Sequence, residues 1–503
     1  MSLVGLDIGT TGCKAVAFDS SGKPLAQARC TYRMHMPQAG ACELDPREVW
    51  AAVQAVLTAV DRATRRKDPI RALGISALAD CVMAVSRGGQ FLSPTLLGMD
   101  SRAQAECQWL REHVGAGSFF ETTGQPLYPL YPLNKILWWK RRLPSVYTRA
   151  RKFLGWQDYV VAQLAGAPFV DYSLASRTGL FDLRAKSWSE DLLSACELPR
   201  TCLPEPVPSG TKVGCTGSRS AKYRGLPPGI AVVVGALDQN CAALGAGVTQ
   251  PGSAADGLGT VECIICPFEG IKTTPEMLAG NFSCCPYIGQ DRYATYAFNF
   301  SAGSLLDWFV HNIAAADVCE AKKQGTDPFH FVLQKIPRAP ASAMVLPHFL
   351  GSGTPYLDPN SKGAILGLNI KTGRYEILKA LCEAINFEIR LNMEYLHSLS
   401  ITVKELRVTG RGARSNALLQ LKADILGLPV HRVTELEGSC YGAAALAGFA
   451  SGELNSVEDF TSRVKIEKSF FPRQGLLAHY SQRFNIYRGL YELLKHVQHQ
   501  MPS

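Results

Sequence analysis

Two turns rich in glycine and threonine could hold a phosphate group. The first, Asp7–Lys14, follows a short apolar run, and the second is Gly257–Thr260. Turns of this kind aim backbone N–H groups and hydroxyls at one point, where an anion is stabilised. The Asp7 carboxylate beside the first turn could hold Mg²⁺ through water, and Lys14 could add positive charge. Taken alone, the first turn is explained equally well as an ordinary hairpin turn.

A second carboxylate, Asp238, ends the apolar run Val232–Leu237 and precedes two amides. Acids at strand ends are where α/β proteins place catalytic groups, although an aspartate also caps helices. Later in the chain, Val408–Asn416 passes from a strand into a glycine turn and a helix start, a shape that suits a nucleoside lying over the backbone. Two phosphate-type turns, two separated acids and a nucleotide-type turn together favour nucleotide phosphate chemistry.

Apolar periodicity and turn signals predict the elements that position these groups. A helix begins after Asp45, which serves as N-cap, with Pro46 at its first position and Glu48 completing a capping box. The predicted strands are Leu3–Asp7, Cys13–Asp19, Pro24–Tyr32 and Arg71–Ser76, and the later helices are Arg374–Ser400, Asn416–Leu426, Ser439–Ser451 and Tyr480–Gln498. This order indicates a mixed sheet covered by helices.

The chain repeats its own beginning just after a Pro/Gly-rich stretch at Gly245–Ser253. Gly5–Phe18 aligns with Ala255–Phe268 through an x-Gly-Thr-x-x-Cys core and several apolar positions. Two similar half-molecules facing each other would leave a repeat of this kind. We therefore expect domains at 1–247 and 248–503, with the acids Asp7 and Asp238 on opposite walls of a single crevice.

Composition excludes several classes of protein. The 503 residues are 47% hydrophobic and 19% charged, an ordinary globular balance. The net charge of +9 is scattered rather than gathered in a stripe, so no nucleic-acid partner is expected. No signal peptide is apparent, and the apolar runs are shorter than the roughly 20 residues of a membrane span. We expect a cytoplasmic protein with no membrane partner.

The 16 cysteines have low density and irregular spacing, so reduced thiols are expected. One group invites a zinc hypothesis: Cys263 and Cys266, followed by Cys284 and Cys285. A zinc site needs tetrahedral ligands from tight turns. The first pair lies instead in a strand-like run, where positions i and i+3 face opposite sides. The pattern therefore favours core thiols over a metal.

The chain resembles the FGGY family of carbohydrate kinases from residue 3 to about residue 455. Many loose motifs in the right order are more specific than any single one. The segments that carry the resemblance are Asp7–Lys14, Asp100–Arg102, Pro132–Trp138, Asp171–Leu180, Gly235–Asp238, Gly363–Leu368 with Ala380–Glu383, Gly410–Ser415 with Gln420–Asp424, and Glu437–Ala444.

The resemblance implies two α/β domains of the RNase H-like type found in actin, Hsp70 and hexokinase, closing over a cleft. The N-terminal domain would bind a small sugar or polyol, and the C-terminal domain would bind ATP with Mg²⁺. Asp238 would be the general base, and Asp7 and Asp238 would hold the metal. The implied substrate residues are Asp80, Asp100, Arg102, Asp238 and Gln239, and the implied ATP residues are Thr10, Thr11, Lys14, Gly259, Thr260, Gly303, Asp307, Gly412, Ala413 and Asn416.

The chain departs from the family pattern in its sugar-reading residues. Leu78-Ala79-Asp80 stands where xylulokinases of the family show Gln-Met-His and glycerol kinases show Gln-Arg-Glu. Asp80 could accept hydrogen bonds from two neighbouring hydroxyls, or it could be a loop or capping acid. Arg411 stands where a glycine is common, and Val261 stands where a serine is common.

The leading hypothesis is ATP-dependent phosphorylation of a ketopentose, as in xylulokinases. The alternatives are a kinase for another polyol such as glycerol or a tetritol, a catalytically weak sugar-binding regulatory relative, and an actin- or Hsp70-like ATPase with a protein partner. The last would show ATPase activity without sugar. A homodimer is left open, because an interface cannot be deduced from one chain.

Overall fold

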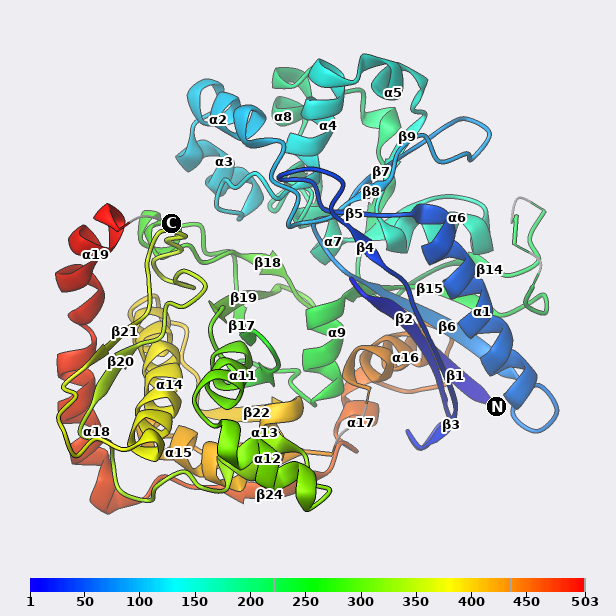
Figure 1. Ribbon diagram of the computed structural model, residues 1–503. Coiled ribbons are helices and arrows are strands. Elements are labelled where there is room, and N and C mark those ends of the chain that lie inside the picture. Colours follow the sequence, from blue (N-terminus) through cyan, green and yellow to red (C-terminus); the bar gives the residue numbers. More distant parts are fainter. Residues whose placement is uncertain (220–221, 224, 435–436, 502–503) are drawn as a thin grey trace.

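The computed structural model describes residues 1–219, 222–223, 225–434 and 437–501. It consists of two mixed α/β lobes, as the resemblance implies (Figure 1). The sheet of the first lobe has the strand order β14-β15-β6-β1-β2-β3. Its strands are β1 (Ser2–Ile8), β2 (Gly12–Phe18), β3 (Pro24–Thr31), β6 (Ile70–Ala77), β14 (Thr211–Cys215) and β15 (Ala231–Leu237). The four strands predicted from the sequence in this region are confirmed within one residue at each end.

The sheet of the second lobe repeats this arrangement in the order β18-β19-β17-β16-β22-β23-β24. The strands are β16 (Ser253–Leu258), β17 (Glu262–Glu269), β18 (Cys285–Pro286), β19 (Arg292–Asn299), β22 (Glu405–Thr409), β23 (Val430–Val433) and β24 (Ile466–Phe470). β16 pairs antiparallel with β17 and parallel with β22, just as β1 pairs antiparallel with β2 and parallel with β6. The sequence repeat is therefore confirmed as two equivalent hairpins, each ending in a glycine-threonine turn.

The helix predicted after Asp45 is α1 (Pro46–Thr64), and it covers one face of the first sheet. Asp45 caps it by accepting a hydrogen bond from the Arg47 N–H. The predicted N-cap is confirmed, and the side chains of Val49, Val53 and Val56 are buried. The predicted capping box is wrong, because within the described residues the Asp45 N–H donates no hydrogen bond to Glu48. The remaining helices of the first half, most of them in an outer subdomain beyond the sheet, are α2 (Gln104–His113), α3 (Ala116–Thr123), α4 (Pro132–Arg142), α5 (Pro144–Arg149), α6 (Trp156–Ala165), α7 (Tyr172–Ser176), α8 (Glu190–Ala195) and the 3₁₀ turn η1 (Arg200–Cys202).

The other strands are short and form small separate sheets in the two halves of the chain. They are β4 (Met34–His35), β5 (Glu43–Leu44), β7 (Met83–Val85), β8 (Thr95–Leu96), β9 (Lys152–Leu154), β10 (Phe169–Asp171), β11 (Phe181–Asp182), β12 (Ser187–Trp188), β13 (Glu205–Val207), β20 (Met344–Leu346) and β21 (Ala364–Leu366). The helices of the second half are α10 (Pro275–Ala279), α11 (Gly303–Asn312), α12 (Ala315–Lys323), α13 (Pro328–Leu333), α14 (Arg374–Ser398), the 3₁₀ turn η2 (Arg411–Arg414), α15 (Asn416–Leu426), α17 (Val457–Thr461), α18 (Gln474–Tyr487) and α19 (Leu490–Gln500).

The C-terminal helix prediction is partly wrong. A single helix was expected over Tyr480–Gln498, but α18 ends at Tyr487 and α19 begins at Leu490. Gly489 lies between the two helices, and glycine disfavours a helix interior. Among the described residues, no helix is both long enough and apolar enough to cross a membrane.

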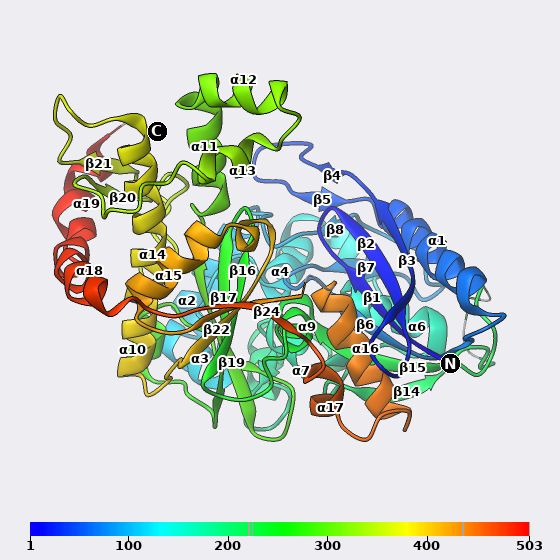
Figure 2. The same cartoon turned by 90° about the horizontal axis from the view of Figure 1, so that it is seen from below.

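Two glycine- and alanine-rich helices connect the lobes: α9 (Asp238–Gly245) and α16 (Gly438–Ala450). Although α16 lies between β23 and β24 of the second sheet in the chain, it packs beside β1 and β6 of the first (Figure 2). A Cβ at Gly5 would lie 1.8 Å from the Cys440 carbonyl oxygen, and one at Gly442 would lie 2.1 Å from the Cys241 carbonyl oxygen. The backbones touch here, so only glycine fits. The helix predicted over Ser439–Ser451 is thereby confirmed as α16, shifted by one residue at each end.

Candidate active site

Three carboxylates stand at one edge of the first sheet. Asp7 lies near the end of β1, Asp238 follows β15, and Asp80 lies three residues after β6, which runs between them. These strands are parallel, so their carboxyl ends meet at the same edge. The expectation that Asp7 and Asp238 face each other from opposite walls is wrong, because both belong to the same wall.

The opposite side of this site comes from the second lobe. β17 begins directly after the second phosphate-type turn, and burial raises the pKa of its Cys263 thiol well above the usual value. The negative charges of Asp256 and Asp238 add to this rise. Asp238 therefore lies within electrostatic reach of the second turn as well as of Asp7.

Burial and neighbouring negative charges raise the pKa values of Asp7 and Asp238. Burial raises the pKa of Asp7 to about 6, against a 3.2 Å hydrogen bond from the Ser76 hydroxyl and the charge of Lys14. Burial, together with the charges of Asp7 and Asp80, raises the pKa of Asp238 to about 7. The Gln239 N–H, which donates to Asp238 over 2.7 Å, opposes this shift. A carboxyl with a pKa near neutrality is suited to accept a proton.

The donor set fits a divalent cation shared with a phosphorylated substrate. Mg²⁺ in proteins commonly uses one or two carboxylates and completes its shell with water and phosphate oxygens. Asp7 and Asp238 offer two such carboxylates with uncompensated charge. Within the described ranges, no group of three or more His, Cys, Asp or Glu residues could hold a metal by itself. That finding includes the four cysteines considered for zinc.

Arg177 is a site residue that the sequence analysis did not single out. Its guanidinium donates to both oxygens of Asp80, at 3.0 and 2.7 Å, and to Gln125 at 2.9 Å, and it stacks over the Tyr131 ring. Asp80 has a positive φ of 58°, which a non-glycine residue rarely adopts. Asp80 is therefore held in a fixed orientation by an ion pair, and it is not a helix cap.

Asp100 and Arg102 lie in the loop next to Asp80 and bond mainly to each other. The buried Lys135 ammonium donates to the carbonyl oxygens of Asp80 and Leu97 at 2.6 Å, which joins the two loops. Asp100 accepts from the Cys42 N–H and from Arg102, which also pairs with Glu43 and stacks over Trp138. This pair shapes the loop around Asp80, with most of its donors and acceptors already used.

The two amides after Asp238 differ in their surroundings. Gln239 is half-buried, whereas Asn240 is fully buried and spans the two lobes. Its side-chain N–H donates to the Pro286 carbonyl over 3.1 Å, and its oxygen accepts from the Tyr296 hydroxyl over 2.7 Å. The helix that carries Asp238 is thereby fixed to the second lobe.

The first phosphate-type turn keeps its side chains accessible. Thr10 is half-buried and Thr11 is exposed, at the tip of the β1–β2 hairpin. The turn is closed by a 3.0 Å hydrogen bond from the Gly9 N–H to the Gly12 carbonyl. Lys14 forms an ion pair with Glu437, which directly precedes α16. Lys14 can therefore respond to a new anion only in competition with Glu437.

The second lobe holds a cavity of about 210 Å³ that is lined by half of the predicted ATP residues. Its lining includes the predicted residues Gly259, Thr260, Gly303, Asp307 and Gly412. A Cβ at Gly303 would lie 2.3 Å from the Gly259 carbonyl oxygen. The start of α11 therefore contacts the second phosphate-type turn backbone to backbone. Of the other predicted ATP residues, Ala413 is buried in η2 and Asn416 begins α15, where its side-chain oxygen accepts from Arg432.

Arg411 fastens the rim of this cavity. Its guanidinium lies 4.1 Å from the Phe329 ring centre and pairs with Asp327 at 3.1 Å and with Asp307 at 3.4 Å. It therefore connects η2 to α11 and to the start of α13. Arg411 stands where a glycine is common in the family, and its side chain contacts these helices.

Lys422, which lines the cavity, belongs to a buried ion triad. The Lys422 ammonium lies 2.9 Å from a carboxylate oxygen of Asp256 and also bonds to Glu262, and all three side chains are almost completely buried. Burial and the neighbouring Asp256 charge raise the pKa of Glu262 to about 8, against the opposing charge of Lys422. Because Glu262 directly follows the second turn, the triad fixes the base of that turn.

Comparisons with known proteins agree with this geometry. Residues 2–245 match the model of the FGGY family of carbohydrate kinases, N-terminal domain, and residues 258–451 match that of the C-terminal domain. A xylulose kinase of Staphylococcus xylosus is 25% identical over 496 residues, which cover 97% of this chain and 99% of that relative. A glycerol kinase of Delftia acidovorans is 30% identical over 484 residues, which cover 93% and 94%.

A solved structure is similar to this chain in fold over its whole length. The crystal structure of a xyloylose kinase from Brucella ovis matches with a TM-score of 0.89 and 26% identity, over 99% of this chain and 100% of that one.

Proposed function

The chain belongs to the FGGY family of carbohydrate kinases, and from this premise we propose that it transfers the γ-phosphoryl group of ATP to a hydroxyl of a ketopentose. The observation that carries the proposal is Asp238, a carboxyl of raised pKa at the sheet edge beside Asp7. Residues 1–247 bind the sugar and residues 248–503 bind the nucleotide.

In the proposed reaction, Asp238 accepts the proton of the attacking sugar hydroxyl. Phosphoryl transfer depends more on positioning and charge stabilisation than on a strong base. Asp80, held by Arg177, accepts hydrogen bonds from sugar hydroxyls, and Gln239 borders the same space. The N–H groups and hydroxyls of the two glycine-threonine turns orient the phosphates. Mg²⁺ held by Asp7 and Asp238 would neutralise charge on the transferring phosphoryl group.

A ketopentose is the first choice and another small polyol is the second. Relatives named as xylulose kinases and as glycerol kinases are similarly distant from this chain. Asp80 stands where a histidine or glutamate reads the sugar in the family pattern, so the side chains that separate these substrates are replaced. A coupled assay of ADP release with pentuloses, tetritols, glycerol and gluconate tests the proposal. We expect the highest kcat/KM for a pentulose, and a higher value for another acceptor would contradict this choice.

The Asp80 carboxylate supplies a direct test of sugar binding. Asp80→Ala is expected to raise the sugar KM about tenfold or more, the size of a lost hydrogen bond to a charged group, and to leave the ATP KM unchanged. Steady-state kinetics with both substrates varied gives the two values. Asp68→Ala, which removes a carboxylate near the N-terminus, is the control. An unchanged sugar KM in Asp80→Ala would remove Asp80 from this role.

The contacts of Arg411 at the cavity rim supply a test of nucleotide binding. Arg411→Ala removes the ion pairs and the stacking contact that hold the cavity rim. Exposed interactions of this kind contribute about 1 kcal/mol, so the Kd for ATP is expected to rise about fivefold in calorimetry. Arg374→Ala is the matched control, because Arg374 pairs with Asp317 on α12 away from the cavity. Equal ATP affinity in wild type and Arg411→Ala would show that the Arg411 contacts do not contribute to nucleotide binding.

We also propose a cytoplasmic location. All 16 cysteines lie within the described residues and are free thiols, which suits a reducing compartment.

A further inference from the structure

A second pocket lies away from the catalytic carboxylates, at the junction of three parts of the chain. It has a volume of about 480 Å³, within the range of small-molecule sites. One wall comes from the first lobe at Tyr172, Lys186 and Ser209, and another comes from the β18–β19 turn. The third comes from α16 and α17. Neither the three site carboxylates nor any predicted ATP residue contributes to its lining.

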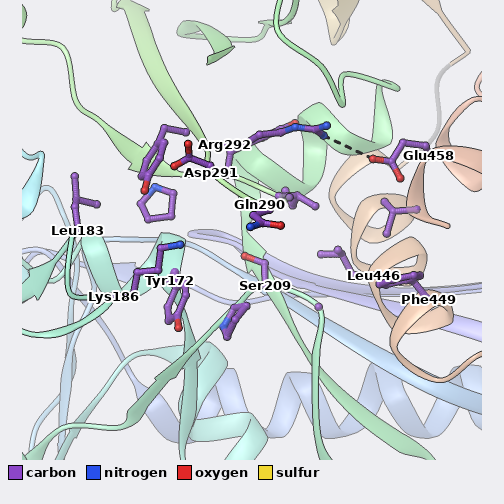
Figure 3. A pocket seen from close by; sticks show the side chains of 18 residues that line it. Tyr172, Leu183, Lys186, Ser209, Gln290, Asp291, Arg292, Leu446, Phe449 and Glu458 are labelled. Carbon is purple, nitrogen blue, oxygen red and sulfur yellow. Dashed lines mark ion pairs between the residues drawn. The ribbon is translucent and has the colours of Figure 1, made fainter. Parts of the chain in front are cut away.

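The polar groups of this pocket converge. In Figure 3, the side chains of Lys186, Ser209 and Gln290 point toward one another across the pocket. Within the described part of the chain, no ion pair is formed by the Lys186 ammonium and no hydrogen bond by the Gln290 amide. Lys186 also has a positive φ of 51°, so an unpaired cation is held on a strained backbone. An ammonium and a side-chain amide N–H together suit a carboxylate or phosphate group.

The opposite end of the pocket is apolar. Leu446, Phe449 and Val457 line it, and Phe449 is half exposed. The other charged groups at the rim are Asp291 and a pair formed by Arg292 and Glu458 at 3.7 Å. Arg292 also donates to the Thr249 carbonyl over 2.9 Å. Lys186 is thus the cation free to meet a ligand, and the space beside it suits an apolar body.

Two short chains of hydrogen bonds join the pocket walls to the residues around Asp238. The Ser209 hydroxyl donates to Asp171 over 2.7 Å, and the Ser173 hydroxyl donates to the same carboxylate over 2.6 Å. Ser173 in turn accepts from the Leu237 N–H over 2.9 Å, and Leu237 directly precedes Asp238. From the other wall, Pro286 accepts from Asn240, two residues after Asp238.

We propose that this pocket is a regulatory site for a small organic anion, a carboxylate or phosphate attached to an apolar body. The anion binds the Lys186 ammonium and the Gln290 side-chain amide, and its body packs on Leu446 and Phe449. Because both lobes line the pocket, a ligand that fits one lobe arrangement better than another shifts the population of that arrangement. The predicted change in turnover rests on the proposed kinase function, whereas the binding itself does not.

Calorimetry on the full chain tests the binding. Phenyl phosphate and benzoate are titrated separately with saturating ADP present, so that the nucleotide site is filled, and inorganic phosphate and phenol serve as partial ligands. We expect one of the two aromatic anions to bind one per chain with a Kd below about 1 mM, and each partial ligand to bind at least tenfold more weakly. Failure of both aromatic anions to bind would overturn the proposal. Binding of benzoate alone would identify a carboxylate ligand, and binding of phenyl phosphate alone a phosphate.

Variants locate the bound anion. Lys186→Met is expected to weaken binding about tenfold and Phe449→Ala about threefold, and both substitutions remove accessible side chains. Arg184→Ala is the matched control, because it removes a cation from the same turn outside the pocket lining. Wild-type affinity in both Lys186→Met and Phe449→Ala would overturn the proposed site.

Turnover separates regulation from binding. The anion is expected to change kcat at least twofold in wild type, and Lys186→Met is expected to need an about tenfold higher anion concentration for the same effect. An unchanged wild-type kcat with the anion bound would overturn the regulatory role. If no sugar supports ADP release, the proposed kinase function fails, and the calorimetric result still decides the binding site.

Discussion

Asp238→Ala is expected to lower turnover by roughly 10²–10⁴, the usual contribution of a positioned general base. The substitution removes the carboxyl whose pKa burial and the neighbouring acids raise to about 7. It leaves the nucleotide cavity, which lies on the other lobe, intact. Steady-state ADP release gives kcat, and calorimetry is expected to show that ATP still binds.

A control and a second substitution make this prediction specific. Asp68→Ala removes an acid that pairs with the N-terminal ammonium, far from the site in the sheet, and is expected to keep wild-type turnover. Asp238→Asn retains the shape of the side chain but cannot accept the proton as a carboxylate does, so it is expected to resemble Asp238→Ala. Near-normal turnover in either Asp238 variant would remove Asp238 from the role of base.

Lys422→Met is expected to destabilise the protein by about 3–5 kcal/mol, the cost of leaving buried charges without a partner. Lys422 is the cation between Asp256 and Glu262, and all three side chains are almost completely excluded from water. A methionine fills similar volume, so the loss arises from charge rather than from a cavity. Denaturant unfolding followed by tryptophan fluorescence measures the change.

Removing the charge that Lys422 compensates tests the cause. Lys422→Met combined with Asp256→Asn is expected to recover part of the lost stability, because the buried carboxylate left without its cation disappears. Lys371→Met, on an exposed loop, is the surface control and is expected to leave the unfolding midpoint unchanged. A wild-type midpoint in Lys422→Met, or no recovery in the double variant, would contradict the electrostatic explanation.

Local sequence signals predicted the hairpins and their turns well. The run from Asp7 to Lys14 and its later repeat carry both strand patterns and turn residues, so short-range physics was sufficient. The same holds for α1, whose cap and first residue are adjacent to its apolar face. The split between α18 and α19 is also local, and Gly489 was the available signal.

Contacts between residues far apart in the chain, such as the order of strands in the sheet and the Arg177–Asp80 ion pair, could not be predicted from the sequence. Whether Asp7 and Asp238 share a wall depends on β6 lying between β1 and β15, and the strand order is fixed by packing of the whole sheet. Arg177 was not singled out because its partner Asp80 is 97 positions away in the chain. It nevertheless lies inside the Asp171–Leu180 motif, where a buried arginine implies a carboxylate partner.

The central claim is that the carboxylates at this sheet edge direct a phosphoryl group to a sugar hydroxyl and not to water. Phosphorus NMR of a reaction containing ATP, Mg²⁺ and the best acceptor tests this most directly. The account predicts one new phosphate monoester for each ADP formed, and almost no ADP when the acceptor is omitted. Release of inorganic phosphate at the rate of ADP formation, with or without the acceptor, would contradict it.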